Sequence, residues 1–270
     1  MNKKKKTKKL KQNVIISMLR FALVLGLLFI WEKYARSGNY ETFNTSYPTE
    51  ILRDLYQFFI SGELAHHALI TIKEALLGLL YGSFIGVFLG VIFSQFNLVG
   101  RVISPIISAI AGIPQLTLSP LYILWFGFGL TSKVILASLM VFFGVFAATY
   151  NSIKNLDQRW IEAANLLGAN ALQTLVKVVI PASTPWIISG IRGGIGACMV
   201  GAIMGEFMGA SGGFGWMITF AASYFNIKRV LACILVLLMF NLILNWVLNR
   251  LEGYLLHWKQ ETRLSLKTDN

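Results

Sequence analysis

Two ionisable residues, Arg192 and Glu206, lie inside a long apolar run of this 270-residue chain. A charged side chain in hydrocarbon costs roughly 2.5–3.5 kcal/mol on insertion scales, so each is a candidate functional residue. The Thr184-Pro185 pair predicts a helix start, which places Arg192 about 10 Å into the helix and Glu206 about 20 Å beyond it. They cannot pair with each other. We expect Arg192 either to pair with another helix or to meet an anionic solute, and Glu206 to form a gate or an interdomain contact.

A second group of polar residues lies in the apolar run 103–126. Ser104-Pro105 and Ser119-Pro120 both predict helix starts, with Pro114 between them. Interrupted helices are tolerated at membrane depth where they line a cavity. The polar side chains of this run are therefore candidates to line a pathway, or they only satisfy backbone groups freed at the break. They are Gln115, Thr117, Ser119 and Tyr122.

Other reactive residue types show no pattern that supports enzyme chemistry. We find no nucleophile beside a base and no paired carboxylates, so the chain is not expected to be an enzyme. The histidines and cysteines lack metal-ligand spacing, and the cysteines lie in apolar runs typical of packing residues. The histidines are His66, His67 and His257, and the cysteines are Cys198 and Cys233. The segment 127–133 ends in Lys133 but lacks the glycine that precedes the lysine of a phosphate-binding loop.

Composition identifies the elements that position these residues. Hydrophobic residues make up 56% and charged residues 13% of the chain, against roughly 25% charged in soluble domains. About 20 residues cross a bilayer as a helix. Six apolar runs reach that length, at 14–34, 69–93, 103–126, 131–150, 186–208 and 229–249. The sequence predicts an all-α integral membrane protein with six transmembrane helices.

The formal charge of +12 is concentrated at the N-terminus, where seven lysines lie within residues 3–11. Such a cluster holds a tail in the cytoplasm near anionic lipid, and no nucleic-acid partner is expected. With both termini inside, fifteen Lys and Arg residues lie on the cytoplasmic side and five outside. We do not expect cleavage of a signal peptide, because the run 14–31 is long for one.

Three parts are predicted along the chain. Residues 1–63 contain the basic tail, the first span and an external segment. In that segment Pro48 precedes an amphipathic pattern at 51–59, which predicts a short surface helix. Residues 64–254 form the main transmembrane domain, with a cytoplasmic loop at about 151–184. Residues 255–270 form a C-terminal tail.

Two ladders of small residues predict close helix packing. One face of a helix repeats every three to four residues, and small residues there let a neighbouring backbone approach where lipid provides no hydrophobic drive. The ladder glycines are Gly78, Gly82, Gly86 and Gly90 in one span, and Gly193, Gly201 and Gly205 in another.

The cytoplasmic loop predicts a bent pair of helices. Asp157 can cap a helix that starts at Gln158, on which Trp160, Ala164 and Leu167 share an anchoring face. Gly168 is suited to end it, because a left-handed residue costs least as glycine. A second helical run over 172–179 is expected to stop before Pro181.

The same loop carries a spaced pattern, Glu162-Ala163-Ala164-x3-Gly168-x9-Val178-x-Ile180-Pro181. It resembles the "EAA" loop of permease subunits of binding-protein-dependent ABC importers, with five literal matches and two aliphatic replacements. The resemblance implies a type I, MetI-like fold in a bacterial plasma membrane, with a second copy of the permease around one pathway. It also implies an extracytoplasmic binding protein and ATPase subunits, which bind ATP and receive Glu162, Ala163, Ala164, Gly168 and Pro181 in a cleft. This chain itself is expected to bind no cofactor.

Further stretches resemble the nitrate, sulfonate and taurine branch of that family. They include residues 105–155, Gly190-Ile191-Arg192, Gly205-Glu206-Phe207, Gly212 to Gly215, and Trp258. The resemblance implies a small anionic solute as substrate. A thiamine-precursor pyrimidine is the alternative within the class. A secondary transporter or channel working alone is a second alternative, expected to show inverted repeats and buried ion-coupling carboxylates.

Overall fold

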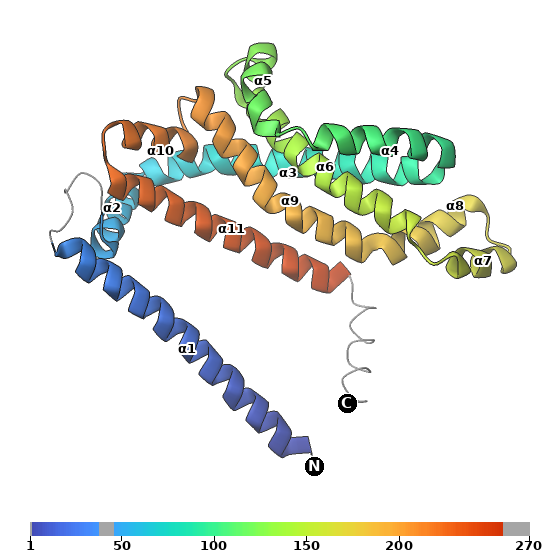
Figure 1. Cartoon of the computed structure of the whole chain (residues 1–270), viewed down its shortest axis with the longest axis horizontal. Coiled ribbons are helices and arrows are strands. Elements are labelled where there is room, and N and C mark those ends of the chain that lie inside the picture. Colours follow the sequence, from blue (N-terminus) through green and yellow to red (C-terminus); the bar gives the residue numbers. More distant parts are fainter. Residues whose placement is uncertain (1, 38–45, 256–270) are drawn as a thin grey trace. The chain divides into compact units, whose positions relative to one another are not determined.

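The computed structural model describes residues 2–37 and 46–255, and every element within them is helical (Figure 1). The chain divides into two compact units, one of residues 1–64 and 218–235, the other of residues 65–217 and 236–270. The predicted C-terminal tail, with His257 and Trp258, lies outside the described residues. Side chains of the basic N-terminal tail also lie outside them.

The first unit contains α1 (Asn2–Arg36) and α2 (Pro48–Ile60), together with residues 218–235. The predicted amphipathic surface helix is confirmed as α2, which begins with proline in its first turn and buries Ile51, Asp54 and Phe58. Arg229 binds both Asp54 oxygens, at 2.7 and 3.3 Å. Its guanidinium also lies 4.2 Å from the centre of the Phe58 ring. These contacts fix α2 onto the start of α11.

The second unit is a set of long helices joined by short turns. The remaining elements of the chain are α3 (Glu63–Gln95), α4 (Asn97–Ala111), η1 (Gln115–Leu118), α5 (Ser119–Phe126), α6 (Leu130–Lys154), α7 (Gln158–Leu166), α8 (Ala171–Thr174), the π segment η2 (Leu175–Val179), α9 (Ile180–Gly209), α10 (Phe214–Ser223) and α11 (Ile227–Leu255).

The predicted spans fall on these helices. Among the described residues, four helical stretches are long and apolar enough to cross a membrane: 63–95, 130–154, 171–209 and 227–254. The α4 and α5 segments, bent by 77°, make a fifth if the pair counts as one span. The first predicted span, 14–34, lies within α1. The all-helical membrane architecture is confirmed.

The glycines of α3 lie against α6 in a constant register. Gly78 meets Ala137, Gly82 meets Val141, Gly86 meets Val145 and Gly90 meets Thr149. Each pair is separated by the same number of residues, so the two helices run parallel. A methyl group on Gly90 would lie 2.8 Å from Thr149 Cβ. The backbones therefore approach as closely as hydrogen side chains allow.

Helix α9 packs antiparallel on the same helix α6. Gly201 lies against Ala137 and Gly205 against Lys133. Gly193 has no other part of the described chain within 4 Å of a Cβ placed there, whereas Gly194 contacts Val141. A four-residue step exceeds a turn by about 40°, so Gly193 is rotated away from Gly201 by about 80°.

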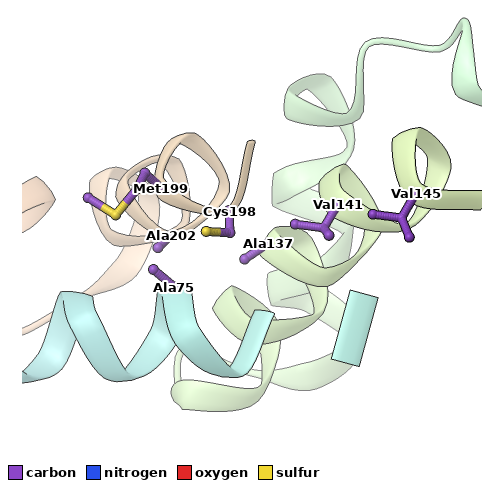
Figure 2. Close-up of a cluster of buried hydrophobic side chains, with 7 residues drawn as sticks. All are labelled: Ala75, Ala137, Val141, Val145, Cys198, Met199 and Ala202. Carbon is purple, nitrogen blue, oxygen red and sulfur yellow. The ribbon is translucent and has the colours of Figure 1, made fainter. Parts of the chain in front are cut away.

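The buried core lies where α3, α6 and α9 meet (Figure 2). It is built from small and β-branched side chains, which fill the narrow space that the glycine contacts leave. Its members are Ala75, Ala137, Val141, Val145, Cys198, Met199 and Ala202.

The proline-rich run breaks once rather than twice. Pro120 lies in the first turn of α5 as predicted, but Pro105 lies inside α4, which already begins at Asn97. The predicted start at Ser104-Pro105 is therefore wrong. A proline removes only one helical N–H bond, and a membrane helix tolerates that loss when neighbours satisfy the freed group. The break falls at 112–114, between α4 and η1.

We predict that Gly201→Ala destabilises the protein and Gly193→Ala does not. A Cβ at Gly201 would lie 2.6 Å from the Ala137 backbone, while the same atom at Gly193 meets open space. Overpacking costs about 1–3 kcal/mol, and each kcal/mol lowers Tm by roughly 2–4 °C in a chain of this size. Thermal unfolding of both variants in detergent measures the difference. Equal melting temperatures would contradict the close packing of α6 and α9.

Candidate functional site

The segment 157–181 begins with a capped helix. The Asp157 side chain accepts the Arg159 backbone N–H at 3.1 Å, and α7 starts at Gln158, which confirms the predicted cap. Hydrogen bonds from the Arg159 side chain and, to a smaller extent, from the Arg159 backbone N–H lower the pKa of the Asp157 carboxyl group. The cap therefore stays ionised at neutral pH and weakens as pH falls towards that lowered pKa.

Gly168 turns the chain at the end of α7. Its φ of +80° lies in the left-handed region, as predicted for a terminating glycine. Its N–H donates to the Asn165 carbonyl at 2.9 Å, and the next N–H, of Ala169, donates to the Ala164 carbonyl at 3.1 Å. Two residues later a reciprocal capping box between Asn170 and Gln173 starts α8. The result is a defined elbow.

The second arm of the elbow does not stop before Pro181. Helix α8, the π segment Leu175–Val179 and α9 form one helical stretch from Ala171 to Gly209, and both Pro181 and Pro185 lie within it. The expected stop at Pro181 and the expected start at Thr184-Pro185 are therefore wrong. The proline ring clashes with the carbonyl four residues earlier, here that of Lys177. Lys177 lies in the wide π turn, which makes room for the ring.

Burial within the elbow differs from the predicted anchoring face. Ala164 is buried, but Trp160 is 61% exposed and Leu167 89% exposed. Glu162 and Ala163 are also exposed. The anchor is thus Ala164 together with the continuous helix to α9. The elbow presents an acidic residue and apolar side chains that nothing in the described chain covers.

A groove lies at the base of the elbow, with a volume of about 670 Å³. The C-terminal end of α6, the start of α7 and the start of α9 line it, with Trp160 and Trp186 among the walls. Ala182 lines the groove, and its neighbour in sequence, Pro181, is half-buried.

Arg192 is paired within the chain. Its guanidinium forms an ion pair with Glu252 of α11, and both side chains are partly exposed. Arg192 Nε has no hydrogen-bond partner among the described residues. The side chain ties the first half of α9 to the end of α11, which matches the expectation that it pairs with another span.

The polar residues at the helix break bond to the break itself. Thr117 Oγ1 donates to the Pro114 carbonyl at 2.7 Å, and Gln115 donates to the carbonyls of Ile110 and Ile113. Tyr122 donates to Gln115 Oε1 at 3.2 Å. Ser119 is buried and donates to the Leu116 carbonyl at 2.7 Å. Thr117 is the exposed member of the four.

Glu206 is fully buried and holds the turn between α9 and α10. Its Oε1 accepts from Thr71 Oγ1 at 2.7 Å, and its Oε2 accepts from the Gly215 N–H at 2.5 Å. The Phe214 N–H donates in turn to Thr71 at 2.8 Å. Gly213, with φ +98°, lets the turn pass directly over the carboxyl group. Glu206 thus caps the start of α10 from inside the bundle.

A buried ion pair that the sequence did not predict lies beside Glu206. Lys133 Nζ binds Glu74 Oε1 at 3.1 Å, and both residues are almost inaccessible. Neither Lys133 nor Glu74 is among the candidate site residues predicted from the sequence. A signal was present in the spacing, since Glu74 and Lys133 each lie four residues before the packing positions Gly78 and Ala137. They share the faces that pack together.

Comparison with known proteins agrees with this architecture. The chain is 32% identical over 241 residues to a probable ABC transporter permease of Haemophilus influenzae, covering 87% of this chain and 97% of the relative. It is 31% identical over 246 residues to a putative aliphatic sulfonates transport permease, SsuC, of Bacillus subtilis, covering 89% of each.

A solved chain of the MetNI methionine ABC transporter, in an inward-facing conformation, superposes with a TM-score of 0.65. The match covers 73% of this chain and 97% of that one at 17% identity, so it shows a shared fold. Residues 82–254, which include the elbow together with Lys133, Arg192 and Glu206, match the model of the binding-protein-dependent transport system inner membrane component family. The chain therefore belongs to the family of binding-protein-dependent transport system inner membrane components.

Proposed function

We propose that this permease moves a small anionic solute of the sulfonate type and is driven at the elbow 157–181 by separate ATPase subunits. The main support for this proposal is that the exposed elbow is joined to the membrane-crossing helix α9 without a break in the helix. The stretch of 39 residues from Ala171 to Gly209 is about 58 Å long. A displacement at one end is therefore passed across the membrane.

The surface of the elbow suits docking into a cleft of an ATPase. Leu166 and Leu167 are each 89% exposed, and Leu172 is 68% exposed. Exposed apolar side chains of this size beside a charge mark interaction sites in soluble surroundings. Glu162 supplies the charge, and the left-handed Gly168 fixes the angle between the two arms. Pro181 lies where the second arm enters α9.

The remaining assembly follows from the family. A substrate-binding protein outside the membrane delivers the solute, and a second copy of the permease completes the pathway in a homodimer. Both termini lie in the cytoplasm of a bacterial cell, and lipid covers the outer helices. The relative named for aliphatic sulfonates supports an anionic sulfonate as the solute. Thr117, exposed at the helix break, is the candidate pathway residue that the described chain leaves most accessible.

We predict that Glu162→Lys separates the permease from its ATPase. Because the carboxylate is exposed and replaced by the opposite charge, the amount of copurified ATPase should fall about tenfold, equivalent to about 1.4 kcal/mol. Copurification in mild detergent, followed by quantification of both subunits, measures the effect. Arg53→Glu is the matched control, since Arg53 is exposed on α2, distant in sequence from the elbow, and has no ion-pair partner among the described residues.

The permease should stay folded in both variants, as checked by its melting temperature. Equal loss of ATPase in the Arg53 control would show a general charge effect rather than docking. Solute uptake that persists after all ATPase activity has been removed would contradict the proposed energy source.

A charge swap tests whether Arg192 serves structure or the pathway. The ion pair between Arg192 and Glu252 favours a structural role for Arg192. Arg192→Glu should therefore lower Tm, and the double variant Arg192→Glu/Glu252→Arg should restore it. A partly exposed pair contributes about 0–1 kcal/mol, so the shift will be a few degrees. Uptake kinetics provide the second readout. A swapped protein with normal Tm but a KM for the solute raised more than tenfold would assign Arg192 to the pathway instead.

A further inference from the structure

The buried network around Glu206 contains more acid than base. Two carboxyl groups, Glu74 and Glu206, meet one ammonium group, that of Lys133. All three side chains are more than nine-tenths buried. Helices α3, α6 and α9 each contribute one of them. With both acids ionised, the cluster would carry a net negative charge out of contact with water, which is strongly unfavourable.

The neighbouring groups do not supply the missing positive charge. His67 Nδ1 accepts the Gly213 N–H at 3.1 Å, so this histidine uses the lone pair of a neutral ring. Its ring stacks on Trp216, with centroids 5.5 Å apart. His66 lies edge-on to His67 with centroids 5.3 Å apart. Thr71 and the N–H groups at the start of α10 are uncharged donors.

One oxygen in the cluster has no hydrogen-bond partner. Glu74 Oε1 binds Lys133, but Glu74 Oε2 is buried and accepts nothing among the described residues. The nearby carboxyl group is that of Glu206, which is bonded to Thr71, one helical turn before Glu74 on α3, and which follows Gly205, packed against Lys133. Two ionised carboxylates are both acceptors and repel each other, whereas one proton lets one carboxyl group donate a hydrogen bond to the other.

We infer that Glu74 and Glu206 form a proton-binding site in which one proton is shared between the two carboxyl groups. The proton comes from hydronium in the solvent: an O–H bond of hydronium breaks to leave water, and an O–H bond to a carboxylate oxygen forms. It leaves one negative charge to balance Lys133. The neutral cluster then holds the α9–α10 turn against α3 through Thr71 and the N–H of Gly215. This site does not depend on the cargo or on the ATPase.

The sign of the pH effect follows from the charge count. Loss of the shared proton at higher pH adds a second negative charge, so the turn is held more weakly and stability falls as pH rises. In Glu74→Gln the amide donates to Glu206 without a proton from water, so this dependence should vanish. The titratable groups that face the two carboxyl groups are Lys133 from α6 and His66 and His67 from α3.

Infrared spectroscopy of the full-length permease in lipid nanodiscs tests the site directly. A protonated carboxyl group absorbs at a different infrared frequency from a carboxylate. Wild-type protein at neutral pH should therefore show the band of a protonated carboxyl group. It should disappear in Glu74→Gln and in Glu206→Gln. The matched control is Glu252→Gln, which removes a partly exposed acid outside the cluster and should leave the band unchanged. A wild-type spectrum without the band, or a band that survives both cluster variants, overturns the inference.

Thermal unfolding across pH supplies a readout that a merely structural role would not give. Wild-type Tm should fall with rising alkaline pH by about 2–4 °C more than that of Glu74→Gln. Parallel pH profiles in the two proteins overturn the inference. If neither glutamine variant folds, the wild-type infrared band and its loss on raising pH still decide the question.

Discussion

Close backbone contact between α3, α6 and α9 is the constraint on which the second unit depends. Lipid tails are as apolar as the side chains of these helices, so burial of leucine gives no net drive for association. Glycine and alanine let the backbones approach instead, and van der Waals contact replaces the hydrophobic effect. Gly78 of α3 and Gly201 of α9 both contact the same α6 residue, Ala137. Ala137 is the point at which the three helices are joined.

That register also determines where charge can be buried. Four residues along each helix from the contacts at Ala137, the residues Glu74, Lys133 and Gly205 lie close together. The start of α10 at Phe214 supplies N–H donors there, because the first turn of a helix has no helical acceptors for its N–H groups. Glu206 uses one of these donors. A pair of acids is therefore stabilised at the end of the glycine stripe, and would be far less stable at its centre.

Local chemistry made much of this structure predictable, and long-range packing accounts for what was missed. The Asp157 cap, the left-handed Gly168 and the amphipathic α2 depend on neighbours in sequence, and each was predicted correctly. The stop at Pro181 was wrong because a π turn, which no local pattern signals, accommodates the ring. Glu74 and Lys133 were missed because charges near span ends look like solvated residues until the register of two helices is known. The roles of the pathway residues depend on partners and stay predictions.

Helix α9 is held near its middle and at its C-terminal end, and this limits how it can transmit a displacement. The Arg192–Glu252 ion pair ties its first half to α11, and Glu206 ties its last turn to α3. Between them Gly194 and Gly201 pack on α6 without room for sliding side chains. A push on the elbow therefore moves α9 together with α6, unless it is absorbed before Pro181. The π segment Leu175–Val179 lies at that position, and single π turns inside α-helices frequently occur at functional sites. Under the proposed function, coupling between the elbow and the membrane thus depends on how rigid these five residues remain when an ATPase subunit occupies the elbow.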